Sequence, residues 1–336
     1  MSVYDIVNRI KRDEAPAVLA TLIGVEGHSY RKAGAVMLFH EGGTIGSLSP
    51  GCMESDLQLR TEEVWESGMP ETVEYDMLSQ DDFSWGEAVG CGGKIKVVLE
   101  PVAGELRNLL VEAHGIITSG KSVILRRSRA DGRYTYSLES ASLESAAAVP
   151  EMAAAYNWSD ASFATLLVPK PRLVLFGPGN DARPIADLAV KAGFRVAIAD
   201  WREGSLRHDF AAAERIICSP AEAADKLHIG SRDYVLICSH QLQRDRIFLE
   251  HVIKHNPCYI GIIGSKARIG MLLEGLEAPE TVHAPVGLPI GGEGPEEIAV
   301  SIVAEMIQVR RSSSRKRPKG ADYLESCRYL SGGGAK

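Results

Sequence analysis

Two cysteines stand in glycine-rich turns, where their type and spacing could support metal or sulfur chemistry. Cys52 lies in Gly46-Ser-Leu-Ser-Pro-Gly-Cys-Met-Glu54, and Cys91 lies in Gly90-Cys-Gly-Gly93. Because glycine has no side chain, each sulfur and its neighbouring N–H groups can lie open to a ligand. A thiolate is also a soft ligand for metals. The pattern predicts that Cys52 and Cys91 form one site for a metal or a metal cofactor. The alternative is that both are ordinary turn residues.

A second candidate site follows an apolar run in the C-terminal half. Gly177-x-Gly179-x-x-Ala182 has the spacing of a dinucleotide-binding turn, and Asp200 ends the next apolar run, where an acid can accept from a ribose hydroxyl. Pro178 removes one N–H donor from the turn, and Asp181 adds a negative charge near the place expected for a pyrophosphate. Two interpretations stay open: a nucleotide or phosphate site, or a Rossmann fold in which the turn serves packing.

Two further turns add candidates to the same sheet edge. Gly261-Ile-Ile-Gly264 precedes Ser265 and Lys266, which could hold an anion at a helix start, and His240 follows another apolar run. Each of these residues could instead be a solvated or locally hydrogen-bonded loop residue.

The elements that must position these residues can be read from hydrophobic periodicity and turn signals. In the first half we expect a helix over 1–12, strands over 17–25 and 34–39, and a helix after Cys52 that ends at Gly68. A strand over 94–99, a helix over 105–118 and a hairpin of 122–127 with 134–138 follow, and residues 139–160 are a connecting segment.

From residue 172 onward strands and helices alternate. Apolar strands are expected over 172–176, 194–199, 215–218, 234–239 and 259–263, and a last helix begins at Gly294. Such βαβ repetition predicts an α/β, doubly wound parallel sheet of Rossmann type with its first strand in a central position. We therefore expect an N-terminal α+β domain over 1–165, a Rossmann-like domain over 169–310 and a basic tail over 311–336.

Composition excludes several classes of protein. The chain has 336 residues and a net charge of −7, although residues 310–319 carry six basic side chains and no acidic one. The rest is therefore more acidic than the total, which argues against nucleic acid as the main partner. The sequence shows no membrane span, no signal peptide and no Cys-x-x-Cys pair, so we expect a cytoplasmic protein.

Taken together, these motifs resemble the XdhC/CoxI family of xanthine dehydrogenase accessory factors. They occur in family order and cover most of the chain outside residues 105–165. The segments that carry the resemblance are Gly27-His-Ser-Tyr-Arg-Lys-Ala-Gly34, Gly46–Glu54, Gly90–Pro101, Leu173–Gly179, Tyr259–Lys266, Val282–Gly291 and Pro295–Ala299.

The resemblance implies a chaperone that binds molybdenum cofactor, assists its sulfuration and delivers it to a xanthine dehydrogenase-like hydroxylase. It implies a homodimer, and a cysteine desulfurase is a further possible partner. The expected cofactor-binding residues are Arg31, Gly51, Cys52, Glu54, Cys91, Gly92, Gly93, Gly177, Gly179, Asp200, His240, Ser265 and Lys266. The chain departs from the family pattern at Pro50, Asn180 and the Ser239-His240-Gln241 segment. These departures surround the expected ligand.

A different class of function remains as the alternative. A nicotinamide-dependent oxidoreductase, or a nucleotide-sensing module, would bind NAD(P) at the Gly177–Ala182 turn and Asp200, with His240 as the acid or base in the enzyme. This interpretation leaves both N-terminal cysteine turns without a role.

Overall fold

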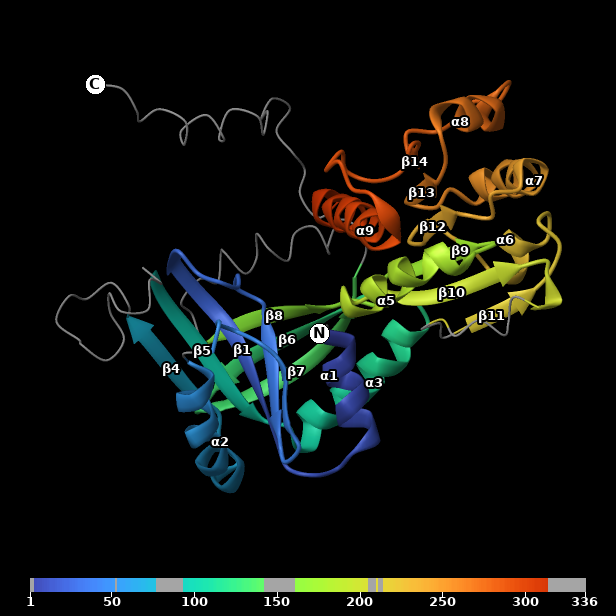
Figure 1. Ribbon diagram of the computed structural model, residues 1–336. Coiled ribbons are helices and arrows are strands. Elements are labelled where there is room, and N and C mark those ends of the chain that lie inside the picture. Colours follow the sequence, from blue (N-terminus) through green and yellow to red (C-terminus); the bar gives the residue numbers. More distant parts are fainter. Residues whose placement is uncertain are drawn as a thin grey trace, which may run out of the picture. The chain divides into compact units, whose positions relative to one another are not determined.

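The computed structural model describes residues 3–51, 53–76, 93–141, 161–204, 210 and 214–313. Cys52, Cys91 and Gly92, and the basic segment from residue 314 onward, lie outside the described residues. The chain divides into two compact units, Met1–Arg172 with Val190–Arg195, and Leu173–Ala189 with Val196–Lys336. Figure 1 shows the first unit in blue to green and the second mainly in yellow to red.

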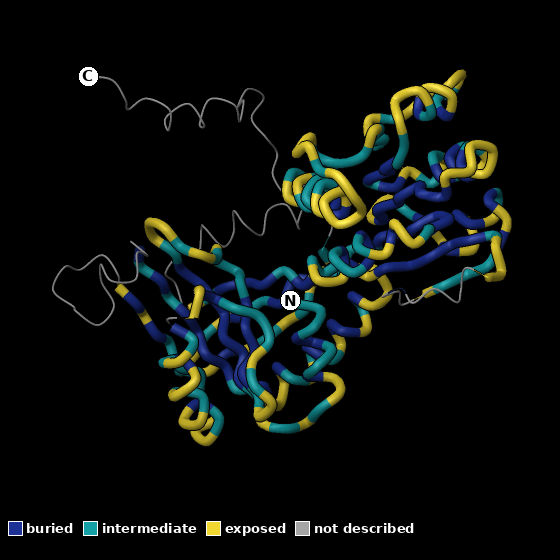
Figure 2. Tube along the Cα trace, viewed as in Figure 1, coloured by how far each residue is buried: buried dark blue, intermediate teal, exposed yellow. Residues whose placement is uncertain are grey.

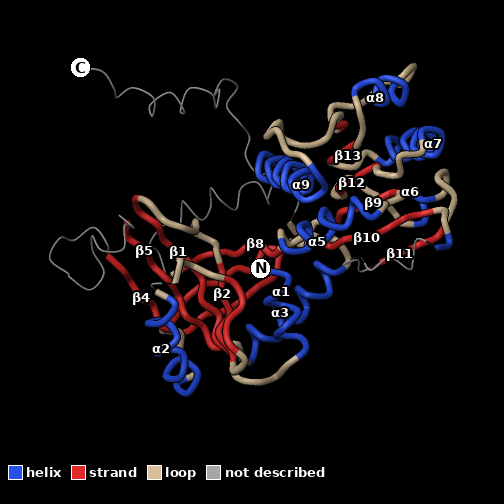
Figure 3. Tube along the Cα trace, in the orientation of Figure 1, coloured by secondary structure: helices blue, strands red, loops and turns tan. Residues whose placement is uncertain are grey.

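The first unit contains three helices and two antiparallel sheets among its described residues, and Figure 3 separates its helices from its strands. Its elements are α1 (Val3–Arg12), β1 (Ala17–Gly27), β2 (Val36–His40), β3 (Gly43–Gly46), α2 (Glu54–Ser67), β4 (Glu71–Asp76), β5 (Gly93–Pro101), α3 (Gly104–Thr118), β6 (Val123–Ala130), β7 (Arg133–Ser140) and β8 (Ser162–Leu167). The larger sheet has the order β3-β2-β1-β5-β4, and the smaller one has the order β7-β6-β8.

Alternation along β5 shows how the larger sheet is covered on both faces. Val97 and Leu99 belong to the same hydrophobic cluster as Leu57 and Val64 of α2. Val98, on the opposite face of β5, clusters with aromatic residues of β7 and β8 in the smaller sheet. The central strands are therefore buried on both sides, as the dark blue segments in Figure 2 show.

A buried ion pair joins the two sheets. The side chains of Glu100 in β5 and Arg127 in β6 are both 0% exposed, with 3.1 Å between Arg127 Nη2 and Glu100 Oε2. Arg127 Nη1 also donates to Thr165 Oγ1 at 2.7 Å, and the guanidinium lies 4.9 Å from the centre of the Phe163 ring. Burial raises the pKa of Glu100, and the charge and hydrogen bonds of Arg127 oppose that change. The Arg127 guanidinium thus offsets part of the desolvation cost of burying the Glu100 carboxylate.

Strand direction in the larger sheet brings strand ends that are distant in the sequence to one end of the sheet. Because all neighbours are antiparallel, β1, β3 and β4 finish at the end where β2 and β5 begin. The described segments 28–35 and 47–51 therefore both leave this end of the sheet, the first connecting β1 to β2 and the second leading from β3 toward α2. The two neighbours of β1 begin at different positions along it. The pairing of β1 with β2 extends to Thr21–Val36, whereas the pairing of β1 with β5 extends to Gly27–Gly93.

The second unit contains the parallel sheet that the sequence predicts. Its strands are β9 (Arg172–Phe176), β10 (Arg195–Asp200), β11 (Glu214–Ile217), β12 (Tyr234–Ile237), β13 (Tyr259–Ile262) and β14 (Val282–His283), in the order β11-β10-β9-β12-β13-β14. The first strand, β9, lies between β10 and β12, and its pairing with β12 is parallel. The doubly wound Rossmann architecture and the central first strand are confirmed.

Helices connect these strands. They are α5 (Arg183–Lys191), α6 (Ala223–Lys226), α7 (Leu242–Val252), α8 (Lys266–Leu273) and α9 (Gly294–Ser313), with short 3-10 turns η2 (Asn180–Ala182) and η4 (Ile253–His255). The 3-10 turn at Asn180 leads into α5, which begins at Arg183 directly after the Gly177–Ala182 turn and ends at Lys191. Within the described residues, no helix is both long enough and apolar enough to cross a membrane.

Three strands of the first unit were not expected from the sequence. β3 and β4 are short, and β3 contains glycine at both of its ends, which weakens its strand signal. β8 follows the segment 142–160, which lies outside the described residues. The expected hairpin is confirmed as β6 and β7, but each strand runs longer than predicted.

The buried pair gives a prediction about stability. Arg127→Met leaves a carboxylate buried without its cation, and we expect a loss of about 3–5 kcal/mol in the free energy of unfolding. The double variant Glu100→Gln with Arg127→Met should recover part of that loss. Urea denaturation followed by circular dichroism measures both.

Arg126→Ala is the matched control on the same strand. Arg126 pairs with Glu139 at 2.6 Å, but these side chains are 32% and 48% exposed, so its removal should cost less than about 1 kcal/mol. Equal losses for Arg126→Ala and Arg127→Met would contradict the importance of the buried pair.

Candidate functional site

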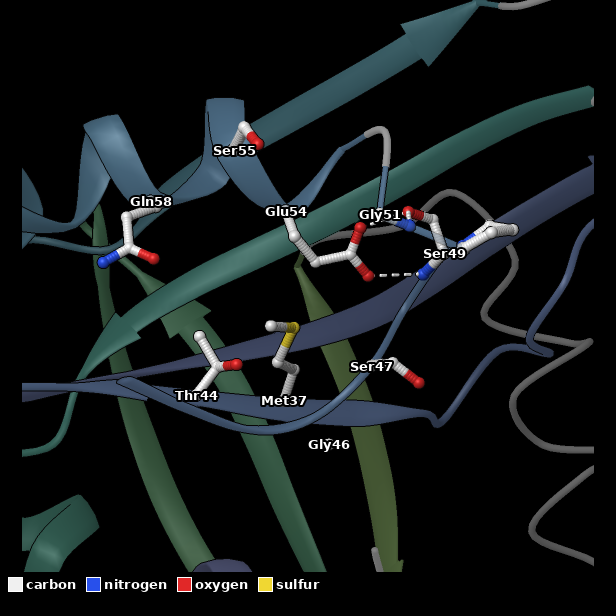
Figure 4. Close-up of a pocket in the computed structure, with 10 residues that line it drawn as sticks. Met37, Thr44, Gly46, Ser47, Ser49, Gly51, Glu54, Ser55 and Gln58 are labelled. Atoms are coloured by element: carbon white, nitrogen blue, oxygen red, sulfur yellow. Dashed lines mark hydrogen bonds between the residues drawn. The ribbon is translucent and has the colours of Figure 1, made fainter. Parts of the chain in front are cut away.

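The Glu54 carboxylate organises the loop that leads to Cys52. Glu54 stands at the start of α2, and its Oε1 accepts hydrogen bonds from the backbone N–H groups of Leu48 at 3.1 Å and Ser49 at 2.7 Å. Its Oε2 accepts a further bond from the Ser49 hydroxyl (Figure 4). The Ser49 hydroxyl oxygen in turn accepts from the N–H groups of Gly51 and Met53. One carboxylate therefore fixes both sides of this loop.

These hydrogen bonds also keep Glu54 ionised. Partial burial acts to raise the pKa of Glu54, but the hydrogen bonds from Ser49 and Leu48 outweigh it and hold the pKa below its ordinary value. The sequence places Glu54 among the expected cofactor-binding residues. The structure shows that it has a structural role in the loop, whether or not it also meets a ligand.

An open pocket of about 320 Å³ lies between this loop, β3 and the first two turns of α2. Figure 4 shows the Met37 side chain directed toward the Glu54 carboxylate, with Thr44 and Gln58 on one side and Ser47 on the other. The remaining lining residues are Gly46, Ser49, Pro50, Gly51 and Ser55. The pocket thus places Gly51 and Glu54 of the candidate site together, with polar neighbours that sequence reasoning did not identify.

Gly93, the first residue of β5, lies close to the segment that follows β1. Gly93 pairs with Gly27 across β5 and β1, and a Cβ atom at Gly93 would lie 2.4 Å from the carbonyl oxygen of His28. Only glycine fits this close approach. Arg31 lies farther along the same segment, where the Ser29 hydroxyl donates to the Arg31 carbonyl oxygen at 2.7 Å. The expected meeting of Cys52 with Cys91 falls outside the described residues.

At the carboxyl edge of the Rossmann sheet, Asp200 is already occupied. Asp200 is fully buried, and its Oδ1 accepts from both the backbone N–H and Nε of Arg202, at 2.8 and 2.9 Å. Its Oδ2 accepts from Arg202 Nη2 at 2.7 Å. The same Nη2 lies 3.1 and 3.3 Å from the carbonyl oxygens of Gly177 and Pro178. A ribose hydroxyl would have to displace Arg202 to reach Asp200.

The two fingerprint glycines meet protein atoms at short distance. A Cβ atom at Gly177 would lie 2.3 Å from Ser239 Cβ and 3.0 Å from the Trp201 ring, so this glycine is required by packing. A Cβ atom at Gly179 would lie 2.7 Å from Asp181 Oδ1. The other oxygen of Asp181 lies 2.9 Å from His240 Nε2. A carboxylate therefore lies over the glycine that would otherwise receive a pyrophosphate.

A buried network beside this edge was not predicted from the sequence. Asp245 in α7 is 1% exposed and accepts hydrogen bonds from the Ser239 hydroxyl and from Arg268 Nη2. Ser265, a candidate anion ligand, instead caps α8, with its side chain accepting from the Arg268 N–H. Lys266 is the first residue of that helix. No sequence pattern marks Asp245, because its partners lie on other elements.

These contacts decide which ligand fits the Rossmann edge as it stands. A dinucleotide needs a free acid for its ribose and a glycine turn open to its pyrophosphate. Here Arg202 covers the acid and Asp181 covers the second glycine. The described residues therefore do not fit NAD(P) without rearrangement. Among these residues, no group of three or more metal-ligating side chains comes together either.

The fold and the positions of the motifs define a class: a two-unit protein with an antiparallel N-terminal unit and a C-terminal Rossmann unit. Residues 173–306 match the family model described as the XdhC Rossmann domain, and residues 10–76 match the XdhC and CoxI family model. The chain belongs to the XdhC and CoxI family.

Three similar proteins are informative. A Bacillus subtilis protein named as a probable subunit of xanthine dehydrogenase is 35% identical over 333 residues, which cover 92% of this chain and 97% of that protein. The Escherichia coli molybdenum cofactor insertion chaperone PaoD is 26% identical over 88% of this chain and 83% of its own length. A crystal structure from Bacillus halodurans, described as a xanthine dehydrogenase, superimposes with a TM-score of 0.80 at 37% identity, covering 97% of this chain and 99% of that one.

The lowered pKa of Glu54 gives a pH-dependent prediction. Because the folded-state pKa lies below the unfolded value, its stabilising effect is present above the ordinary pKa of 4.5 and is lost as the pH falls through the folded pKa. The difference in unfolding free energy between the wild type and Glu54→Gln should therefore shrink steadily as the pH is lowered below about 5. Glu62→Gln, at an exposed position of the same helix, is the matched control and should change the free energy of unfolding by less than about 0.5 kcal/mol. A difference that grows toward acid would contradict this role of Glu54.

The occupied Rossmann edge gives a second prediction. Asp181→Asn removes the negative charge over Gly179, and we expect NADH to bind about fivefold more tightly or better, the effect of about 1 kcal/mol of repulsion. NADH fluorescence titration measures the change. Asp187→Asn removes an exposed charge from the following helix and should leave binding unchanged. Micromolar NADH binding by the wild type that Asp181→Asn weakens would overturn the inference.

Proposed function

We propose that this protein binds molybdenum cofactor transiently, assists its sulfuration and delivers it to a xanthine dehydrogenase-type hydroxylase. The observation that carries the proposal is the strand direction in the antiparallel sheet, in which β1, β3 and β4 end where β2 and β5 begin. In the sequence, Cys52 follows the end of β3 by six residues, and Cys91 precedes the start of β5 by two residues. The similarity to PaoD, named as a molybdenum cofactor insertion chaperone, supports the same function.

The chemistry of the residues fits a carrier. Molybdenum cofactor supplies a pterin, a phosphate and a metal held by a dithiolene. The two thiols would hold the metal or protect its sulfur, and Arg31 would add positive charge beside the anionic parts of the cofactor. A carrier must release its ligand, so moderate affinity is expected of this site.

The proposal includes partners and a compartment. Besides the client hydroxylase, a cysteine desulfurase would provide the sulfur, and two copies of the chain would form a homodimer in the cytoplasm. The Bacillus subtilis relative is named as a probable xanthine dehydrogenase subunit, and this supports a role for the present chain as a partner of such an enzyme.

A nicotinamide-dependent oxidoreductase is the weaker candidate. It requires Asp200 and Gly179 to receive a dinucleotide, but Arg202 and Asp181 lie over them. The candidate acid or base at that edge is His240, and its side chain is paired with Asp181. The contacts of this edge therefore favour cofactor carriage over hydride transfer.

The proposal predicts that the wild-type chain, purified from cells that make molybdenum cofactor, carries molybdenum together with a pterin that becomes fluorescent on oxidation. Cys52→Ala should lower both contents severalfold, because a soft metal ligand is lost. A client hydroxylase produced beside that variant should contain less sulfurated cofactor.

Cys258→Ala is the matched control. Cys258 lies in the Rossmann unit, where its thiol donates to the Asp233 carbonyl oxygen at 3.2 Å and burial raises its pKa to about 11. Its removal should leave the cofactor content unchanged. A wild-type protein free of molybdenum and pterin, or a Cys52→Ala variant that loads its client normally, would count against the proposal.

A further inference from the structure

Two histidines lie against the N-terminal helix α1, and neither belongs to the candidate sites. His114 is part of α3, and His40 is the last residue of β2. α1 packs against both of these elements and against β3, with Ile6, Val7 and Ile10 in a shared hydrophobic cluster. A helix of 10 residues is marginally stable by itself, so α1 depends on this packing. Any charge that weakens the packing therefore acts on the whole helix.

His114 is buried beside α1 in a place that does not suit a proton. Its exposed fraction is 7%, and neither ring nitrogen has a hydrogen-bond partner among the described residues. The ring centre lies 5.6 Å from that of Tyr4 in α1. Burial lowers the pKa of His114, and the charges of Lys11 and Arg12 in α1 lower it further. Protonation would therefore add a buried charge close to two cations.

His40 accepts hydrogen bonds at the nitrogen that a second ring proton would occupy. Its Nδ1 lies 3.4 Å from Arg9 Nη2 of α1 and 3.0 Å from the backbone nitrogen of Gly42. Both neighbours are donors, so Nδ1 must offer its lone pair and the ring must be neutral. Burial lowers the pKa of His40, the charge of Arg9 lowers it further, and Asp13 partly offsets both effects. Protonation would replace the hydrogen bond from Arg9 with repulsion.

Other charged contacts of α1 keep their charge where histidine titrates. Lys170 Nζ lies 2.6 Å from Asp5 Oδ1, and Arg9 Nη2 lies 2.6 Å from Asp13 Oδ2. Arg107 of α3 donates to the Asp13 carbonyl oxygen at 3.0 Å. Carboxylates protonate near about pH 4 and guanidinium groups stay charged, so these contacts persist in mild acid. Further charged side chains on α3 and next to α1 and β2 are exposed, namely Glu14, Glu41, Glu105 and Glu112.

The remaining neighbours of α3 are apolar where they meet its buried face. α3 also packs against β6 and β7, through residues that include Leu125 and Leu138. The charges that act on His114 come from α1, and those that act on His40 come from α1 and from Asp13, the residue after its end. The position of α1 and the charge of the two rings are therefore coupled.

We propose that α1 is a pH-sensitive element, which stays packed on the first unit while His40 and His114 are neutral and is released when acid protonates them. The proposal goes beyond cofactor carriage and does not depend on it. Packing of α1 lowers the proton affinity of both rings. Its stabilising effect is therefore fully present above about pH 6.5, the ordinary value for histidine, and is lost as the pH falls below that value. Each ring can change the equilibrium by up to about tenfold per pH unit.

Hydrogen–deuterium exchange of the full-length protein, followed by mass spectrometry, tests the proposal. Exchange is measured at about pH 7.5 and about pH 5.5 and corrected for the intrinsic pH dependence of amide exchange. We expect protection of residues 3–12 to fall about tenfold or more at the lower pH, whereas protection of β1 changes less than about twofold. An equal change in α1 and β1, or no change in α1, would overturn the proposal.

A double variant, His40→Asn with His114→Leu, removes both titrating rings. The asparagine amide oxygen can accept the hydrogen bonds made to His40 Nδ1, and leucine is an apolar helix former. The change in α1 protection between the two pH values should then fall below about twofold. His251→Asn, in α7 of the Rossmann unit, is the matched control and should keep the wild-type change. A double variant that keeps the full change would refute the role of these rings.

Lys11→Glu is a second variant that alters no buried group. Lys11 is exposed, and the new carboxylate replaces a cation that acts on His114, so the change in α1 protection between the two pH values should shrink by about twofold or more. A uniform loss of helix stability cancels, because the measured quantity is the difference between two pH values in one variant. An unchanged or larger difference in Lys11→Glu would contradict the proposal, even if the double variant failed to fold.

Discussion

Strand direction is the constraint that decides where the chemistry-bearing loops of this protein lie. In the first unit, antiparallel pairing makes β1, β3 and β4 end where β2 and β5 begin, although these strands are far apart in the sequence. In the second unit, parallel pairing places the carboxyl ends of β9, β10, β12 and β13 along one edge. Both candidate sites therefore follow from backbone topology before any side chain is considered.

Several carboxylates near these sites form hydrogen bonds with other groups of the protein. Glu54 binds the loop before α2, Asp200 binds Arg202, and Asp245 binds Ser239 and Arg268. Each is at least partly buried, and a buried carboxylate is tolerated when donors surround it. The two units differ in what this leaves for a ligand. The Glu54 pocket stays open, whereas the fingerprint acid of the Rossmann edge is covered by its neighbour two residues along.

Much of the fold could be predicted from the sequence because periodicity and turn chemistry are local. The parallel sheet, the hairpin at Asp131-Gly132 and the helix ending at Gly68 follow from such signals. The contacts that define the sites could not be predicted in this way. The contacts of Arg202 with Asp200, and of Glu54 with the loop before α2, have no signal in the sequence. Those roles depend on side-chain directions that only the assembled backbone fixes.

The Glu100–Arg127 pair has a consequence for the fidelity of folding. Successive side chains of a strand point to opposite faces, so a slip of β5 by one residue would turn Glu100 toward the α2 side, away from its guanidinium. Both charges would then be buried without a counter-ion. Registers shifted by one residue are thus disfavoured by an electrostatic penalty as well as by poorer packing. Since β5 begins at Gly93, this electrostatic constraint on strand alignment also keeps Gly93 opposite Gly27, at the close approach to His28 where only glycine fits.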